Sequence, residues 1–312
     1  MITLRQAALD PIACARANRK YSLAFTVILL VLIALLHPGT RNLRKYSKEV
    51  SDAIAHAVDS PAEPKKAPEW HALHEKYTKE LAAAKDVDLL MYGDSIFESL
   101  LGNQFGQANA VWADVAKVWT KYHGSSKSMV LAISGDTTVQ LLWRLQHGEL
   151  PATTDIKQAV ILIGTNDLTA YHQHQLTDAD ETASAVSAGV IAVCEQLIDH
   201  SPRMKIVLMA LLPRGAKEVE APAVKALLPN KFTAAIDAIN ERLEQYAAGR
   251  KQVTYLDCSQ GFVEDNPKIG GGKRINVQHM PDVLHPNAAG MQQMLTVCLG
   301  PALGLKQTDL TA

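Results

Sequence analysis

The sequence predicts an α/β domain in which helices cover both faces of a parallel β-sheet. Five short, nearly continuous apolar segments predict the strands of that sheet: Val87–Tyr92, Met129–Ile133, Ala159–Ile163, Ile206–Ala210 and Val253–Leu256. Segments with helical periodicity separate them, including Ala183–Ile198 and Phe232–Tyr246. Strands buried on both faces have such uniformly apolar sequences, and their alternation with helices is typical of a doubly wound sheet. Sheets of this kind bind ligands beyond the carboxyl ends of their strands.

The N-terminal segment predicts a membrane anchor ahead of this domain. A basic tail over residues 1–20 precedes Tyr21–Leu36, a run of sixteen uncharged and mostly apolar residues. As a helix this run would extend about 24 Å, enough for a thin bilayer with Arg19 and Lys20 at one end. Residues 21–37 are therefore interpreted as a single-pass transmembrane anchor or an uncleaved signal.

The sequence leaves two alternatives to this anchor. Cleavage of a signal peptide would release a secreted protein, but His37-Pro38-Gly39-Thr40 provides no small-x-small cleavage site. A buried core helix is disfavoured, because Tyr21–Leu36 lies outside the periodic elements of the domain and has no polar face. The side of the membrane that the domain faces stays open, because four Lys or Arg residues lie on each side of the segment.

A stalk over residues 38–68 is expected to connect the anchor to the domain. Its last part, Ser60–Pro68, is rich in Pro and charge and is unsuited to a helix or a strand. A helix then begins near Glu69, because four apolar residues follow at helical spacing: Trp70, Leu73, Tyr77 and Leu81. The predicted α/β domain therefore covers residues 69–312.

Composition excludes several classes of function. The chain has 312 residues, 47% of them hydrophobic, and a net charge of -1, so it has no basic field for binding nucleic acid. Its four cysteines are Cys14, Cys194, Cys258 and Cys298. Because they form no CxxC pair and no cluster, we expect free, mostly buried thiols rather than a zinc site or a disulfide framework.

Glycines and polar residues follow the predicted strands where each strand ends. Gly93-Asp94-Ser95 follows the first strand and precedes a short helical segment, whose N-terminus would favour negative charge near Ser95. Further groups follow later in the chain: Ser134-Gly135-Asp136-Thr137-Thr138, Gly164-Thr165-Asn166-Asp167, Leu211-Leu212-Pro213-Arg214-Gly215 and Asp282-Val283-Leu284-His285-Pro286. Each group alone is common turn chemistry. The first four groups follow successive strands and the last precedes the final helix, and this order predicts one site, with Ser95 as candidate nucleophile.

Four of these blocks resemble those of the SGNH (GDSL-type) hydrolases: Gly93-Asp94-Ser95, Gly135, Gly164-Thr165-Asn166-Asp167 and Asp282-x-x-His285. Within that superfamily, four segments are similar to the catalytic α subunits of intracellular platelet-activating-factor acetylhydrolase: Gly135–Thr138, Leu142–Leu145, Gly148–Leu150 and Leu211–Gly215. The resemblance covers about Asp88 to Gly290. It implies the SGNH hydrolase fold, a flavodoxin-like three-layer domain with a five-stranded parallel sheet, and suggests a homodimer. It does not cover the anchor and stalk.

The resemblance implies a serine esterase with a Ser-His-Asp triad. Neutral His285 would remove the proton of the Ser95 hydroxyl, and Asp282 would orient the imidazole and stabilise its charged form. The backbone N–H groups of Ser95 and Gly135 and the side-chain amide of Asn166 would form the oxyanion hole. No cofactor and no metal is expected.

The same resemblance implies a small acyl pocket lined by Ile96, Thr165 and Leu284. An acetyl or other short acyl group is therefore expected, while the alcohol half of the ester could come from an acetylated lipid or glycan. The sequence leaves open an O-acyltransferase or carbohydrate acetylesterase with the same triad, and a catalytically silent binding module. Three metal ligands at His279, Asp282 and His285 are a weaker alternative, because Pro281 interrupts the helix that such spacing would need.

Overall fold

The computed structural model describes residues 67–123, 127–152, 156–173, 178–215, 222–266 and 272–304. All of them belong to one compact unit, Ala53–Ala312. The expected basic tail, the anchor at Tyr21–Leu36 and nearly all of the stalk lie outside the described residues.

The central sheet has five parallel strands in the order β4-β1-β5-β6-β8. Their bounds are β1 (Leu89–Gly93), β4 (Ser128–Ala132), β5 (Gln158–Leu162), β6 (Lys205–Met209) and β8 (Val253–Leu256). The five predicted strands are confirmed, each within two residues of its expected limits. The chain moves outward from β1 to β4 and then returns across β1 to β5, so the strand order reverses beside β1. In doubly wound sheets the ligand site lies at such a reversal, beyond the carboxyl ends of the strands.

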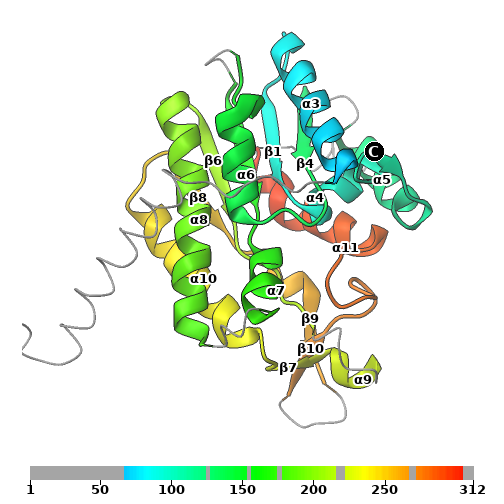
Figure 1. Ribbon diagram of the computed structural model, residues 1–312. Helices are drawn as coiled ribbons and strands as arrows, with labels where there is room; N and C mark the ends of the chain where they lie inside the picture. The colour runs from blue at the N-terminus through cyan, green and yellow to red at the C-terminus, as the bar shows by residue number, and fades with distance from the viewer. Residues whose placement is uncertain are drawn as a thin grey trace, which may run out of the picture. The chain divides into compact units, whose positions relative to one another are not determined.

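Helices pack on both faces of this sheet (Figure 1). The larger ones are α3 (Pro68–Ala83), α5 (Ala113–His123), α6 (Thr138–Arg144), α7 (Thr165–Gln173), α8 (Ala179–His200), α10 (Thr233–Ala248) and α11 (Ala288–Gln293). Helices α6, α8 and α10 pack side by side in one layer, and α5 packs against α11 in the other. Crossovers between parallel strands are right-handed, so connections that run in opposite directions across a sheet place their helices on opposite faces. The chain reverses its direction across the sheet at β4, which accounts for the two layers.

Shorter elements complete the described part of the domain. They are α4 (Ser95–Glu98), α9 (Pro222–Lys225), α12 (Gly300–Ala302), and the short helical segments η1 (Ser99–Leu101), η2 (Ala110–Trp112), η3 (Leu145–Glu149), η4 (Ser259–Phe262) and η5 (Met294–Leu299). A two-stranded hairpin joins β2 (Asn103–Gln104) to β3 (Gln107–Ala108), and a three-stranded sheet has the order β7-β10-β9 (Leu227–Leu228, Lys273–Ile275, Val263–Asp265). The sequence did not predict these small sheets, because strands of two or three residues carry no readable periodicity.

Helix α3 begins at Pro68, one residue before its predicted start, with proline in the first helical turn, where its missing N–H costs no bond. The four residues that predicted this helix, Trp70, Leu73, Tyr77 and Leu81, are all buried. The Tyr77 hydroxyl donates to the carbonyl of Ala132 at 3.1 Å, which ties α3 to the end of β4. Helix α3 is therefore part of the same domain as the sheet and is held at the edge that carries β4.

Helix α8 is also long and apolar enough to span a bilayer, the only described helix that is. However, 61% of its apolar 18-residue stretch is buried against the rest of the domain. Its apolar composition therefore fits its position in the core, where it packs against α6 and α10.

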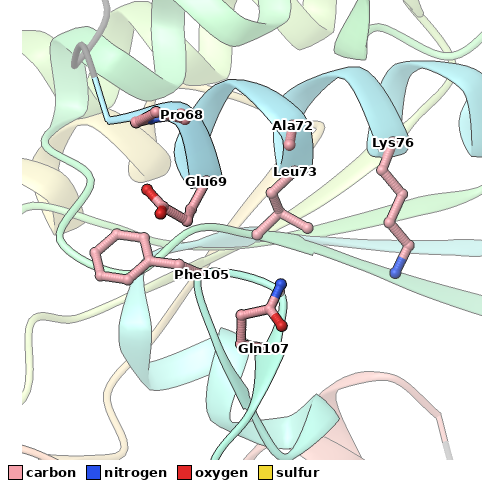
Figure 2. Close-up of a pocket in the computed structure, with 8 residues that line it drawn as sticks. Pro68, Glu69, Ala72, Leu73, Lys76, Phe105 and Gln107 are labelled. Carbon is pink, nitrogen blue, oxygen red and sulfur yellow. The ribbon is translucent and has the colours of Figure 1, made fainter.

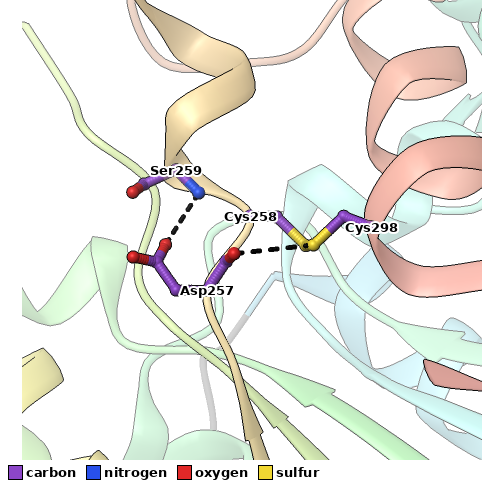
Figure 3. Close-up of a disulfide and its surroundings, with 4 residues drawn as sticks. All are labelled: Asp257, Cys258, Ser259 and Cys298. Atoms are coloured by element: carbon purple, nitrogen blue, oxygen red, sulfur yellow. Dashed lines mark hydrogen bonds between the residues drawn. A yellow bond between two sulfur atoms is a disulfide. The ribbon is translucent and has the colours of Figure 1, made fainter. Parts of the chain in front are cut away.

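The prediction that all four cysteines are free thiols was wrong for two of them. Cys258 and Cys298 form a disulfide, with their Cα atoms 5.7 Å apart (Figure 3). It joins the residues after β8 to η5, which are 40 residues apart in sequence. Because the packing of the C-terminal segment beside β8 brings the two together, their spacing carried no signal. Cys194, buried on α8, is free as expected.

Candidate active site

The candidate nucleophile lies at the junction of β1 and α4. Strand β1 ends at Gly93 and α4 begins at Ser95, while Asp94 caps the helix by accepting a hydrogen bond from the Ile96 N–H at 3.0 Å. A Cβ atom on Gly93 would lie 2.6 Å from the carbonyl oxygen of Leu162. Only glycine therefore lets β1 approach β5 this closely just before the turn.

His285 and Asp282 lie beside this serine although they are almost 200 residues further along the chain. The Ser95 Oγ is 2.9 Å from His285 Nε2, and His285 Nδ1 is 2.7 Å from Asp282 Oδ2. Because an ionised carboxylate can only accept, we assign the ring proton to Nδ1, which leaves Nε2 as the acceptor for the serine hydroxyl. The other oxygen of Asp282 accepts the backbone N–H groups of Leu284 and His285, at 3.0 and 2.7 Å.

The loop that carries this acid-base pair has an unusual backbone at Val283. Its φ angle is +59°, in the left-handed region that β-branched residues rarely adopt. Val283 N donates to the carbonyl of Met280 at 2.9 Å, and its own carbonyl accepts the Gly215 N–H at 2.7 Å. A Cβ on Gly215 would lie 2.5 Å from the Val283 side chain. The loop after β6 therefore holds the Asp282–His285 turn in place.

The residues expected to stabilise the oxyanion are brought together at the reversal in strand order. Gly135 has a φ of +76° and lies in the turn that follows β4, where Asp136 N donates to the carbonyl of Ile133. Asn166, in the first turn of α7, donates its side-chain amide to the carbonyl of Asp136 at 2.9 Å, and this amide is 3.4 Å from Asp94 Oδ2. Asn166 therefore lies between the loop of Gly135 and the turn of Ser95.

A buried polar network contacts the loop after β4 through Asp136. The fully buried Arg144 binds the carboxylates of Asp136 (2.8 Å) and Glu149 (2.6 Å). Trp70 donates its indole N–H to Asp136 at 2.7 Å, and His74 lies 2.7 Å from Glu149. Burial lowers the pKa of Arg144, but the two carboxylates raise it more, so that the guanidinium keeps its charge. The sequence pattern had indicated Trp70 and the loop of Asp136, whereas Arg144 and Glu149 were singled out only through the family resemblance.

Two further buried carboxyl groups lie beside Asn166. Burial raises the pKa of Asp94 to about 7, against the opposing hydrogen bond from Ile96 and with added repulsion from Asp136 and Asp167. Burial likewise raises the pKa of Asp167 to about 6, although hydrogen bonds from Thr138 lower it. The charge beneath the candidate oxyanion hole therefore changes between about pH 6 and 7.

The three residues expected to line the acyl pocket are all buried: Ile96, Thr165 and Leu284. The guanidinium of Arg214, itself buried, donates to the backbone carbonyl of Thr165 and lies 3.3 Å from its hydroxyl oxygen. Trp112 on η2 stands next to the catalytic candidate His285, with ring centroids 5.3 Å apart. Nothing in the sequence pattern indicated Trp112, because a single tryptophan at a short helical turn has no periodic neighbour.

The metal alternative has no support in the described residues. His279 Nδ1 lies 2.6 Å from the carbonyl oxygen of Gly261 and so donates a hydrogen bond there. Within the described ranges, no group of three or more His, Cys, Asp or Glu residues is arranged to hold a metal ion.

Two hollows of the surface lie away from Ser95. A groove of about 310 Å³ runs between α3 and the β2–β3 hairpin, with Leu73 and Lys76 on the helix side and Phe105 and Gln107 on the hairpin side (Figure 2). A cavity of about 130 Å³ lies beside Arg214 and the first half of α10. Ser95, Asp282 and His285 do not line either of them.

Comparison with known proteins identifies the family. Residues 91–293, more than half of the chain, match the GDSL-like Lipase/Acylhydrolase family. The chain belongs to this family. The range of the GDSL match includes Ser95, Asn166 and His285, so the whole candidate site falls within it. This GDSL protein is therefore a serine ester hydrolase.

The GDSL domain is similar to the α subunits of platelet-activating factor acetylhydrolase IB. It is 24% identical to the human alpha1 subunit over 211 residues, which are 68% of this chain and 75% of the relative. It is 27% identical to the rat alpha2 subunit over 223 residues, 71% of this chain and 78% of the relative. A solved structure from Streptococcus pneumoniae described as a platelet activating factor has 21% identity and a TM-score of 0.51, and the match covers 73% of this chain and 89% of that one. At this identity the last match supports the fold alone.

Proposed function

We propose that this GDSL hydrolase cleaves short-chain, acetyl-like esters through an acyl-enzyme on Ser95, with His285 as general base and Asp282 as its orienting carboxylate. The observation that carries the proposal is the continuous chain of contacts from Ser95 Oγ to His285 Nε2 (2.9 Å) and from His285 Nδ1 to Asp282 Oδ2 (2.7 Å). This geometry matches what nucleophilic catalysis by serine requires.

The chemistry proceeds in two balanced halves. His285 Nε2 takes the hydroxyl proton as Ser95 Oγ attacks the ester carbonyl, and the resulting imidazolium gives that proton to the departing alcohol. Water then attacks the acyl-enzyme with His285 again as base, which releases the carboxylic acid and restores the serine. Both steps pass through a tetrahedral oxyanion, for which the N–H groups of Ser95 and Gly135 and the amide of Asn166 are the proposed donors. Each such donor lowers the barrier by about 3 to 4 kcal/mol.

The acyl group is proposed to be short. Ile96 follows the nucleophile, Thr165 precedes Asn166 and Leu284 precedes His285. All three are buried, and the Arg214 guanidinium donates to the carbonyl of Thr165. The similarity to acetylhydrolase subunits also supports acetyl esters. The half-exposed Trp112 beside His285 offers an apolar ring surface where the alcohol half of an acetylated lipid or glycan would leave.

We further propose that the protein is anchored in a membrane by Tyr21–Leu36 and that the hydrolase domain faces an oxidising compartment. The Cys258–Cys298 disulfide supports this orientation, since such bonds persist in secretory, periplasmic or extracellular surroundings and are rare in the cytosol. Carbonate washing should leave the full chain in the membrane pellet. In sealed vesicles whose interior is the oxidising compartment, the domain should be protected from added protease. Digestion of the domain in intact vesicles would refute this orientation.

The experiment that tests the proposed chemistry replaces Ser95 by alanine in the full-length protein. Ser95→Ala should abolish hydrolysis of p-nitrophenyl acetate and labelling by a fluorophosphonate, with an unchanged thermal melt. Ser187→Ala is the control, because Ser187 is also a helical serine but lies on α8, where its buried hydroxyl donates to the carbonyl of Ser184. Undiminished turnover by Ser95→Ala would refute the assignment, and intact binding without turnover by the wild type would favour a silent module.

A further inference from the structure

Glu98 is a fully buried acidic residue that joins three separate segments of the domain. It is the last residue of α4, the short helix that begins at Ser95, and its side chain is 0% exposed. One carboxylate oxygen accepts the backbone N–H of Gly106 at 2.7 Å, and the other accepts that of Ser134 at 2.7 Å. Gly106 belongs to the β2–β3 hairpin that lines the groove of Figure 2, and Ser134 to the loop after β4.

Burial of a carboxylate is costly in a position that could hold an apolar side chain. Its desolvation is compensated only where hydrogen bonds satisfy the oxygens. An apolar residue here would leave the Gly106 and Ser134 N–H groups without this acceptor, so the carboxylate is needed where the two segments meet. Its two short bonds constrain the positions of the segments that carry these donors.

The Ser134 bond matters because the two proposed backbone donors of the oxyanion hole lie on different segments. Ser95 N belongs to α4, and Gly135 N belongs to the loop after β4. A long bond of 3.4 Å links Ile133 N to the carbonyl of Gly93, whereas the bond between Glu98 and Ser134 is 2.7 Å and ends one residue before Gly135.

Asp136, the residue after Gly135, is also held by hydrogen bonds. Asp136 binds Trp70 and Arg144 through its side chain, and its carbonyl accepts the amide of Asn166. Gly135 itself has a φ of +76°, which allows a sharp turn between the two anchored residues. Its N–H is therefore directed by the anchors on either side of it.

We propose that Glu98 is a positioning residue, which holds the Gly135 N–H at a fixed place relative to Ser95 through the Ser134 backbone. The inference rests on the proposed function, since it matters only if these N–H groups stabilise an oxyanion. Both tetrahedral intermediates of the reaction use the same donors, so displacement of one donor slows acylation and deacylation alike and leaves ground-state binding of the ester nearly unchanged.

The test is the isosteric change Glu98→Gln in the full-length protein. A glutamine has one acceptor oxygen, so its NH₂ group must face either Gly106 N or Ser134 N, donor against donor. We expect kcat for p-nitrophenyl acetate to fall about 10- to 100-fold, less than the roughly 100- to 1,000-fold loss when an oxyanion donor is removed, because the Gly135 N–H is displaced but still present. KM should change by less than about twofold, because the interaction is made in the transition state. A boronic acid inhibitor, whose tetrahedral adduct places an oxygen in the hole, should lose affinity in proportion to kcat/KM.

Rates are expressed per active site counted by fluorophosphonate labelling to completion, so that a loss of folded protein does not count as a loss of kcat. Glu98→Asp is the second variant, because it keeps the charge but is one methylene too short to reach both donors, and it should also lower kcat. Ile239→Val, which shortens a fully buried side chain on α10, is the control for general destabilisation and should keep kcat at temperatures below its melt.

The outcomes separate the inference from the function it rests on. If Ser95→Ala is inactive but Glu98→Gln and Glu98→Asp keep the wild-type kcat, or change KM alone, the positioning role is refuted and the proposed chemistry stands. If Ser95→Ala hydrolyses the ester, the proposed function fails, and the role of Glu98 fails with it.

Discussion

Reduction of the Cys258–Cys298 disulfide should markedly lower the thermal stability of the hydrolase domain. The bond closes a segment of 40 residues that runs from the end of β8 through the β9–β10 strands and the Asp282–His285 turn to η5. In the chain-entropy model, a crosslink over this separation stabilises the folded state by about 4 kcal/mol at 25 °C. Each kcal/mol corresponds to about 2 to 4 °C in a domain of this size, so we expect the Tm to fall by about 8 to 16 °C.

The assay compares thermal melts of the wild type with and without a phosphine reductant. Reduced wild type is the cleanest reference, because it keeps both side chains and loses only the bond. The double variant Cys258→Ala/Cys298→Ala should melt low and be insensitive to reductant. Cys194→Ala is the matched control, since it removes a buried thiol from α8 while the disulfide stays, so it should still respond to reductant.

Peptide mapping without reduction provides the direct test of the bond. It should recover the peptides of Cys258 and Cys298 joined to each other. Free thiols at both positions in protein isolated from an oxidising compartment, or equal melts with and without reductant, would refute the reasoning. The expectation of free cysteines would then hold for these residues after all.

Two further predictions concern the active site. If Ile96, Thr165 and Leu284 close the acyl pocket, acetyl esters should exceed octanoyl esters in kcat/KM, since one methylene of misfit costs about 1 to 3 kcal/mol. Leu284→Ala should reduce this difference in kcat/KM between the two esters. An octanoyl preference in the wild type would contradict the small pocket. The raised pKa of Asp94 stabilises the folded state fully below about pH 4, and this contribution is lost as the pH rises through about 7. The Tm of Asp94→Asn should therefore fall less between pH 5 and 8 than the Tm of the wild type. Parallel profiles of Tm against pH would show that Asp94 does not titrate in this range.

The sequence by itself determined the sheet and the residues gathered at its edge. Strands buried on both faces must be almost wholly apolar, so β1 and its four neighbours could be located from hydrophobicity alone. Since the carboxyl ends of parallel strands meet at one edge, Ser95, Asn166 and His285 could be assigned to one site before their distances were known. The order of short motifs then indicated the family, because chemistry restricts which residue types can follow each strand.

Only the tertiary structure decided the contacts that hold this edge in position. Cys258 meets Cys298, and Glu98 meets Ser134, through the packing of segments whose separation in sequence follows no period. The left-handed backbone of Val283 depends likewise on its partner Gly215, which comes from a different loop. Hydrophobic periodicity reports which face of an element is buried, but it does not report which polar atoms meet there. The residues proposed to perform the chemistry could therefore be selected from local pattern, whereas those proposed to position them became visible only in the folded chain.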